Sequence, residues 1–138
     1  MAPENSAILA AIYDPQTGLW ETPTTLSVCT TATDPRISAI VNGIDFSVVV
    51  TWTEICEEKT RLYAAMRPGQ LSDWTSSVKI SQNDEDVQSQ RFLKINAEGK
   101  IIATWSSVDS LGALNSCSST SVIGTDNAWT VPKLIPGL

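Results

Sequence analysis

The most reactive side chains in this chain of 138 residues are three cysteines. Cys29, Cys56 and Cys117 are far apart in the sequence, and no two of them form a CxxC pair. This spacing does not predict a zinc site, because structural zinc sites usually take two ligands from one short loop. We expect three half-buried free thiols that pack as small apolar side chains. One disulfide with one free thiol is the alternative.

Two acidic segments are the other candidates for chemistry. Residues 83–86 (NDED) offer oxygen ligands of the kind that calcium prefers, and residues 54–58 (EICEE) follow a strand-like run. Neither segment contains a recognisable acid–base pair, so we expect both to be solvated turns. The chain has no histidine, which removes the commonest general base and metal ligand. We therefore expect no enzymatic activity, no cofactor and no metal.

The overall charge argues against nucleic acid as a partner. The chain has 15 acidic and 9 basic residues, a net charge of −6, and its basic residues are scattered rather than clustered. No apolar run approaches the length of a membrane-spanning helix. The apolar residues 7–13 follow Glu4 and lack the basic flank of a signal peptide. We expect a soluble protein, with its compartment left open.

The elements that position these residues are indicated by a repeat. The five tryptophans fall into two series with one shared period: Trp20, Trp74 and Trp129 at spacings of 54 and 55, and Trp52 and Trp105 at a spacing of 53. The flanking sequence repeats as well, as GLWETPTTLS at 18–27, SDWTSSVKIS at 72–81 and NAWTVPKLIP at 127–136. This self-similarity predicts one repeat domain over 1–138, with copies at 6–58 and 60–111 and a partial copy at 112–138.

Within each copy the local sequence favours short β-strands. Residues 47–52 (SVVVTW) and 100–105 (KIIATW) are rich in β-branched and aromatic side chains, and residues 61–66 and 74–81 complete the set in one copy. Residues 54–66 are the best helical candidate, but their repeat partners favour strands. Four antiparallel strands in a repeat of this length are typical of a β-propeller blade, so we expect an all-β fold of about two and a half blades. A β-sandwich is the alternative, but it does not explain the period.

In this fold the five tryptophans are expected to act as packing plugs between neighbouring blades. Each is a large apolar side chain, and a blade buries the faces of its sheet only by stacking against its neighbours. A platform for stacking a sugar is the alternative for any one of them.

Residues 13–27 (YDPQTGLWETPTTLS) resemble the Asp-box of sialidase-type propellers. Asp14, Gly18 and Trp20 stand for the aspartate, glycine and tryptophan of that motif. The resemblance implies a sialidase-like propeller in which this box is a structural turn between the third and fourth strands of a blade. Sialidases hold a substrate carboxylate with an arginine triad. Arg36 and Arg91, near the starts of the first strands of two blades, are the candidates for such ligand binding.

The number of blades leads to a functional expectation. A propeller needs at least four blades to close, so we expect this chain to associate with copies of itself or with other blades. The expected function is a non-enzymatic propeller protomer that serves as a protein- or glycan-binding scaffold. One alternative is a part of a sialidase-like glycoside hydrolase completed by other blades or chains. Another is a purely structural repeat, natural or engineered.

Overall fold

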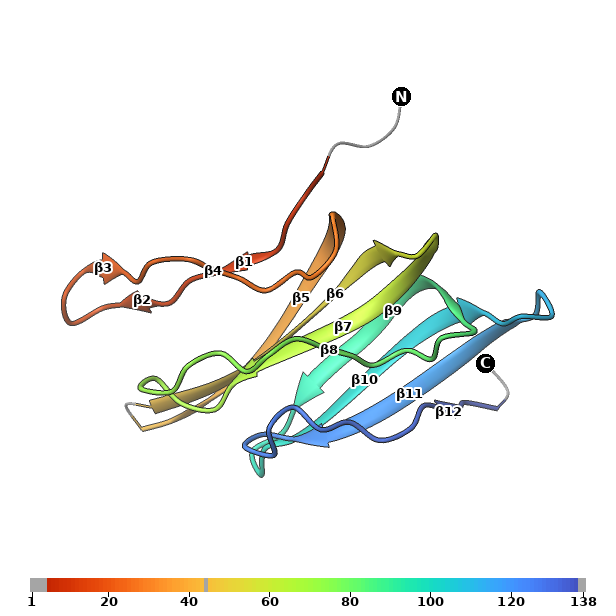
Figure 1. Ribbon diagram of the computed structural model, residues 1–138. Helices are drawn as coiled ribbons and strands as arrows, with labels where there is room; N and C mark the ends of the chain where they lie inside the picture. Colours follow the sequence, from red (N-terminus) through yellow and green to blue (C-terminus); the bar gives the residue numbers. More distant parts are fainter. Residues whose placement is uncertain (1–4, 44, 137–138) are drawn as a thin grey trace.

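A computed structural model describes residues 5–43 and 45–136, and all of its regular elements are β-strands (Figure 1). They are β1 (Leu9–Ala10), β2 (Tyr13–Asp14), β3 (Leu19–Trp20), β4 (Thr24–Thr25), β5 (Thr31–Asn42), β6 (Asp45–Cys56), β7 (Lys59–Arg67), β8 (Val78–Lys79), β9 (Asp86–Ile95), β10 (Lys100–Val108), β11 (Leu114–Val122) and β12 (Lys133–Leu134). The expected all-β fold is confirmed. Residues 54–66 form the end of β6 and most of β7 rather than a helix. No helix among the described residues is long and apolar enough to cross a membrane.

The strands form two four-stranded antiparallel sheets and one narrow ribbon. Sheet 1 has the order β5-β6-β7-β8 and sheet 2 the order β9-β10-β11-β12, so each sheet is a meander that follows the chain. The ribbon consists of residues 6–27, in which β1 pairs with β4 and β2 with β3. Among the described residues, no sheet closes on itself.

Sheet 1 lies in the middle of the molecule, between the ribbon and sheet 2 (Figure 1). Its central strand β6 is buried from Val48 to Glu54 because both of its faces are covered. Val50 and Trp52 pack against the ribbon, whereas Val49 packs against sheet 2. This arrangement explains why β6 has a nearly continuous run of β-branched residues instead of alternating apolar and polar ones.

Two layers of core hold the stack together. Between the ribbon and sheet 1, Trp52 packs with Ile8 and Leu26, and its exposed fraction is 0%. Between the two sheets, Trp105 packs with Leu62 and Ile80 and is equally buried. Full burial of a large apolar side chain contributes about 2–3 kcal/mol relative to exposure, so these two layers are the main source of stability.

The three tryptophans of the first series occupy equivalent positions, as one hydrogen-bond pattern shows. In each case the residue after the tryptophan donates its backbone N–H to the carbonyl of an earlier residue. Its side-chain oxygen accepts the backbone N–H of that same earlier residue. The pairs are Glu21 with Ile12 (2.9 and 3.0 Å), Thr75 with Met66 (2.8 and 3.0 Å) and Thr130 with Thr120 (2.9 and 2.9 Å). A glutamate or threonine therefore follows each tryptophan, because its side-chain oxygen satisfies a backbone donor.

The expected fourth strand at 74–81 is much shorter in the structure, where β8 contains only Val78 and Lys79. The Thr75 hydroxyl accepts the backbone N–H of Met66, which a longer strand would have paired with a carbonyl.

The hairpin turn between β6 and β7, residues 57–58, has positive φ angles of 54° and 69° at Glu57 and Glu58. Two successive left-handed residues are what a two-residue type I′ hairpin requires. Of the expected turn at 42–45, Ile44 lies outside the described residues.

The expectation of three free thiols is wrong. Cys29 and Cys56 form a disulfide, with their Cα atoms 5.8 Å apart. The antiparallel pairing of β5 with β6 places Thr31 opposite Ile55, and so brings the segment before β5 to the end of β6. Cys117 stays free and is 3% exposed. Burial raises the pKa of its thiol, partly offset by a hydrogen bond with Ser107.

Candidate functional site

The tryptophans give the stack a direction. We call the side of each layer that faces lower residue numbers its front and the opposite side its back. Trp74 packs at the front of sheet 1 against the core beneath the ribbon, and Trp129 packs at the front of sheet 2 against the core shared with sheet 1. The equivalent residue in the ribbon, Trp20, is 66% exposed, because no described layer lies in front of it. Trp20 therefore differs from the expected buried plug.

Around Trp20 the front of the ribbon is apolar. The ring of Tyr13 lies 5.3 Å from that of Trp20 at an angle of 57°, and Leu9 on β1 is also exposed. Each of the strands β1 to β4 has one neighbour among the described strands, so both edges of the ribbon are unpaired. An exposed apolar surface with an open strand edge favours contact with another protein.

The Asp-box-like residues form the tip of the ribbon. The Asp14 carboxylate accepts the N–H of Gln16 at 2.9 Å, and Gly18 donates its N–H to the Asp14 carbonyl at 2.8 Å. Gly18 has a φ of 72°, a conformation that favours glycine. Asp14 and Gly18 thus shape the hairpin that presents Trp20 to solvent.

A second uncovered region lies on the front of β5. The strand register makes Ile37, opposite Val50, equivalent to Leu93, opposite Ala103. Ile37 is 70% exposed, whereas Leu93 is partly buried against the core between the sheets. The ribbon is too narrow to cover β5, so the front of the stack lacks the cover that sheet 1 gives to sheet 2.

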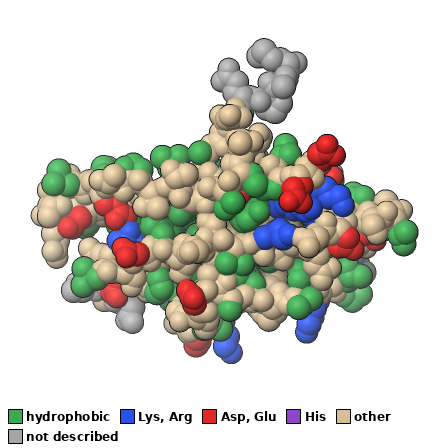
Figure 2. Space-filling view, in the orientation of Figure 1, with side chains coloured by type: hydrophobic (Ala, Val, Ile, Leu, Met, Phe, Trp, Pro, Cys, Tyr) green, Lys and Arg blue, Asp and Glu red, His purple; other side chains and the backbone are tan. Residues whose placement is uncertain are grey.

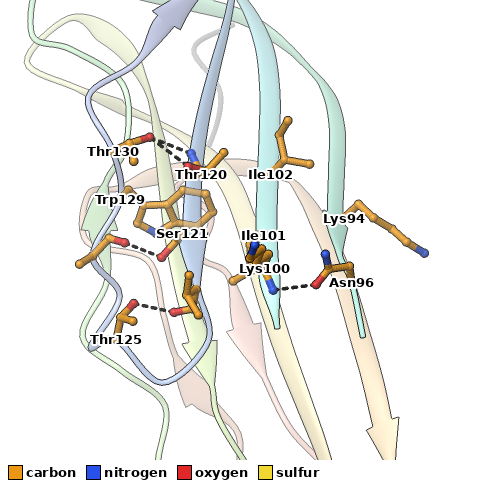
Figure 3. A pocket seen from close by; sticks show the side chains of 12 residues that line it. Lys94, Asn96, Lys100, Ile101, Ile102, Thr120, Ser121, Thr125, Trp129 and Thr130 are labelled. Atoms are coloured by element: carbon orange, nitrogen blue, oxygen red, sulfur yellow. Dashed lines mark hydrogen bonds between the residues drawn. The ribbon is translucent and has the colours of Figure 1, made fainter. Parts of the chain in front are cut away.

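On the back of sheet 2 there is a groove of about 700 Å³ (Figure 3). Its lining includes Ile102 and Thr120, and we call it the back-face groove. The strand register makes these two residues equivalent to Val49 and Met66 on the back of sheet 1. Val49 and Met66 belong to the core cluster against which Trp129 packs.

The charge around the back-face groove is positive. Lys94 and Lys100 both contribute to its lining (Figure 3). Elsewhere, acidic and basic side chains are interspersed on the face seen in Figure 2. A pair of lysines at the groove therefore gives it a local charge opposite to that of the chain as a whole.

The β11 row on the back of sheet 2 is more polar than its counterpart in sheet 1. Strand register relates the two rows residue by residue. Ser116, Ser118 and Thr120 stand where sheet 1 has Leu62, Ala64 and Met66. The back of sheet 2 thus combines an apolar groove floor with hydroxyl groups that hydrogen-bond readily to water.

The two candidate arginines are not equivalent in the structure. Arg36 lies opposite Thr51 in sheet 1, and the corresponding position in sheet 2, opposite Thr104, is occupied by Phe92. The Arg36 guanidinium pairs with Asp34 at 3.4 Å, and Arg91 is exposed at the irregularity in β9. Among the described residues, no hydrogen bond or ion pair links the two arginines into a carboxylate-binding pair.

The loop at 83–86 is organised by an arginine that sequence reasoning missed. One guanidinium nitrogen of the buried Arg61 donates to the backbone carbonyls of Gln82, Asn83 and Glu85 at 3.1, 2.7 and 3.2 Å. Glu85 is only 6% exposed, and its carboxylate accepts the indole N–H of Trp105 at 2.6 Å. The expectation of a fully solvated loop is therefore wrong at Glu85. The loop carbonyls bind a guanidinium of the chain itself.

The comparison with known proteins adds no family to these observations. No protein family, curated protein or solved structure matches the chain.

Proposed function

We propose that this chain is a non-enzymatic β-propeller-type protomer that associates with itself from front to back. In this arrangement Trp20 of one copy enters the back-face groove of the next. The observation that carries the proposal is the exposure of Trp20 at 66%, whereas its equivalents Trp74 and Trp129 pack on the layer in front of them. An exposed tryptophan at a repeated packing position supports a missing neighbour of the same kind.

The groove supports the same pairing. Its lining residues Ile102 and Thr120 are equivalent to Val49 and Met66, the residues of sheet 1 in the core cluster against which Trp129 packs. The contact between copies would therefore repeat the contact between the two sheets of one copy. The groove also has a positive charge from Lys94 and Lys100, whereas the chain as a whole has a net charge of −6. Opposite charges favour fast association between copies.

The two contact surfaces are different, so the interface is heterologous. Such interfaces form rings when the rotation between copies closes and open filaments when it does not. Two copies would bring together four of the four-stranded sheets, since each copy contributes two. Four blades are the smallest number found in a closed propeller, which makes a dimer the smallest assembly that meets this count.

Light scattering on two variants and their mixture tests the proposal. Trp20→Ala removes the inserted side chain, and Ile102→Lys places a charge in the groove of the other surface. Each variant alone should be monomeric at concentrations where the natural chain associates. A one-to-one mixture should form dimers and nothing larger, because only one intact contact can then form. Leu111→Ala, at a loop residue that is 92% exposed, is the matched control and should associate normally.

A monomeric natural chain would contradict the proposal. So would a mixture that stays monomeric while both variants are folded, as judged by circular dichroism and a cooperative thermal transition.

Glycan binding is a second candidate function, and the exposed pair of Tyr13 and Trp20 favours it. Aromatic rings at a surface provide the flat apolar face on which a sugar ring can stack. The Ile102→Lys variant separates the two functions, since it keeps Trp20 exposed and removes association. Binding of this monomeric variant to a glycan array, lost in the Trp20→Ala variant, would support a glycan site at the ribbon.

A further inference from the structure

Three potential metal ligands meet where the segment leading out of the ribbon reaches the end of β6. The sulfur atoms of Cys29 and Cys56 and a carboxylate oxygen of Glu54 all lie within 4.8 Å of one another. Glu54 and Cys56 lie on the same strand, and the disulfide holds Cys29 beside them. The cluster is independent of the surfaces proposed above for association.

Glu54 is the unusual member of this cluster. Its side chain is buried, with 1% of its surface exposed. One carboxylate oxygen accepts the backbone N–H groups of Val28 and Cys29 at 2.7 and 2.9 Å. The other oxygen, Oε2, is buried and has no hydrogen-bond partner among the described residues. A buried carboxylate oxygen without a partner is costly, which indicates a role that the oxidised protein does not use.

We propose that, when the disulfide is reduced, Cys29, Cys56 and Glu54 form a binding site for a thiophilic divalent cation of the zinc type. Two thiolates and one carboxylate are ligands that zinc accepts, with metal–sulfur bonds of about 2.3 Å and metal–oxygen bonds of about 2.0–2.2 Å. A tetrahedral site with these bonds separates its ligand atoms by roughly 3.5–3.8 Å, which small side-chain movements within the observed cluster provide. Water can take the fourth position, since both cysteines are only half-buried.

The site is switched by oxidation. A dithiol reductant transfers two electrons and two protons to the disulfide, which breaks the sulfur–sulfur bond and leaves two thiols, while the reductant becomes a disulfide. Metal binding then forms two metal–sulfur bonds and releases the two thiol protons to solvent. In the reverse direction a disulfide oxidant accepts two electrons from the two thiolates and becomes a dithiol, the sulfur–sulfur bond of the chain forms again, and the cation is released.

The third cysteine provides an internal control. Cys117 lies on β11 in the core between the sheets, where it packs with Trp105 rather than with Glu54. Its replacement by serine should leave the site intact. The proposal therefore predicts the same metal stoichiometry for the natural chain and for Cys117→Ser.

Titration with Co²⁺, a spectroscopic substitute for zinc, tests the site. The full chain and its Cys117→Ser variant are reduced with a dithiol, desalted without oxygen and titrated. We expect one Co²⁺ per chain, with thiolate-to-cobalt charge-transfer absorption and the intense visible bands of a tetrahedral ion. The oxidised protein should show neither. A reduced chain that shows no thiolate-to-cobalt absorption would overturn the proposal.

Glu54→Gln tests the third ligand, because glutamine keeps the size of the side chain and can still accept the two backbone N–H groups. Loss of a group that acts on the metal should weaken affinity by at least about tenfold and alter the visible bands. An unchanged affinity and spectrum would remove Glu54 from the site. If reduction alone loosens the fold, added Zn²⁺ should raise the melting temperature of the reduced chain only, and much less in Glu54→Gln. A rise of equal size in Cys29→Ser/Cys56→Ser would count against the site.

Discussion

The side-chain amide of Asn127 donates a hydrogen bond to the backbone carbonyl of Ala64 at 2.8 Å, although the two residues are 63 positions apart. The same amide nitrogen donates to the carbonyl of Ser76 at 2.9 Å, and its oxygen accepts the indole N–H of Trp129 at 2.7 Å. Asn127 is 2% exposed. One asparagine thus connects the loop after β11 to β7 and to the segment that leads into β8, and it orients Trp129, which packs between the two sheets.

Replacing Asn127 with alanine should be strongly destabilising. The change leaves the buried carbonyl of Ala64 and two partly buried groups, the Ser76 carbonyl and the Trp129 indole N–H, without this partner, and we expect a loss of about 2–4 kcal/mol in the free energy of unfolding. Asp126→Ala is the matched control, because Asp126 has the same φ of 59° and an exposed side chain. Urea denaturation of both variants measures the difference. Equal losses would show that backbone conformation, rather than the hydrogen bonds, sets the cost.

The two buried tryptophans at equivalent sheet positions should respond differently to substitution. Trp105 donates to the Glu85 carboxylate at 2.6 Å, whereas Trp52 Nε1 has no partner among the described residues. Both changes to phenylalanine remove similar volume, but only Trp105→Phe breaks a buried hydrogen bond to a carboxylate. We expect it to cost about 1–3 kcal/mol more than Trp52→Phe in chemical denaturation. Equal stability of the two variants would refute this difference.

Reduction of the disulfide should lower stability in the absence of metal. The bond between Cys29 and Cys56 spans 27 residues, and closing a loop of this length stabilises a protein by about 3 kcal/mol. Guanidinium denaturation with and without a dithiol, in the presence of a chelator, measures the loss. Cys117→Ser should lose the same amount on reduction. A denaturation midpoint that does not move would contradict the prediction.

Asp109 should contribute stability that is lost in acid. The backbone N–H of Ala113 and then the amide of Asn115 hold the pKa of Asp109 below its ordinary value of 3.8. Because the folded-state pKa is the lower one, the contribution is present above pH 3.8 and disappears as the pH falls through the lowered value. Asp109→Asn should therefore be less stable than the natural chain at neutral pH and equally stable in strong acid. A difference that does not vary with pH would argue against this linkage.

Cys117 should react slowly in the native protein. Burial raises the pKa of its thiol above the ordinary 9.0, which lowers the fraction of reactive thiolate, and its exposed fraction is only 3%. In the oxidised chain, alkylation by iodoacetamide at pH 8 should be slow in buffer and rapid in denaturant. Mass spectrometry then counts one modified cysteine after unfolding. Rapid alkylation under native conditions would show that the packing around β11 opens easily.

The sequence predicted the strands well where apolar side chains repeat on both faces of a sheet. The runs that became β6 and β10 are rich in β-branched residues, and the spacing of Trp52 and Trp105 placed them in equivalent strands. The shared period was less accurate for the first strands. The 54-residue spacing of Trp20 and Trp74 sets Ile37 against Arg91, whereas the strand register equates Ile37 with Leu93. The turns cause this shift, because Asn42 pairs with Asp45 between β5 and β6, whereas Ile95 pairs with Ile101 across a longer turn between β9 and β10.

The sequence analysis left one disulfide only as an alternative and missed its partners and the cation cluster, for one physical reason. Their members are far apart in sequence, and only the pairing of β5 with β6 brings Cys29 to Glu54 and Cys56. Spacing rules detect ligands that share one loop, so they could not detect these. The burial of Glu54, beside two exposed glutamates in the same acidic run, likewise depends on the ribbon that covers it.

The hydroxyl row on the back of sheet 2 would determine the strength of the proposed contact between copies. Ser118 is half-buried and Thr120 is exposed, so both hydroxyl groups can stay hydrated when that face is bare, and their exposure in a separated chain costs little free energy. Covering these two residues also stabilises less than covering Ala64 and Met66 does inside the chain. In the proposed assembly, contacts between copies would then be weaker than contacts between the sheets of one copy. The assembly would be reversible, and protein concentration would govern the population of rings or filaments.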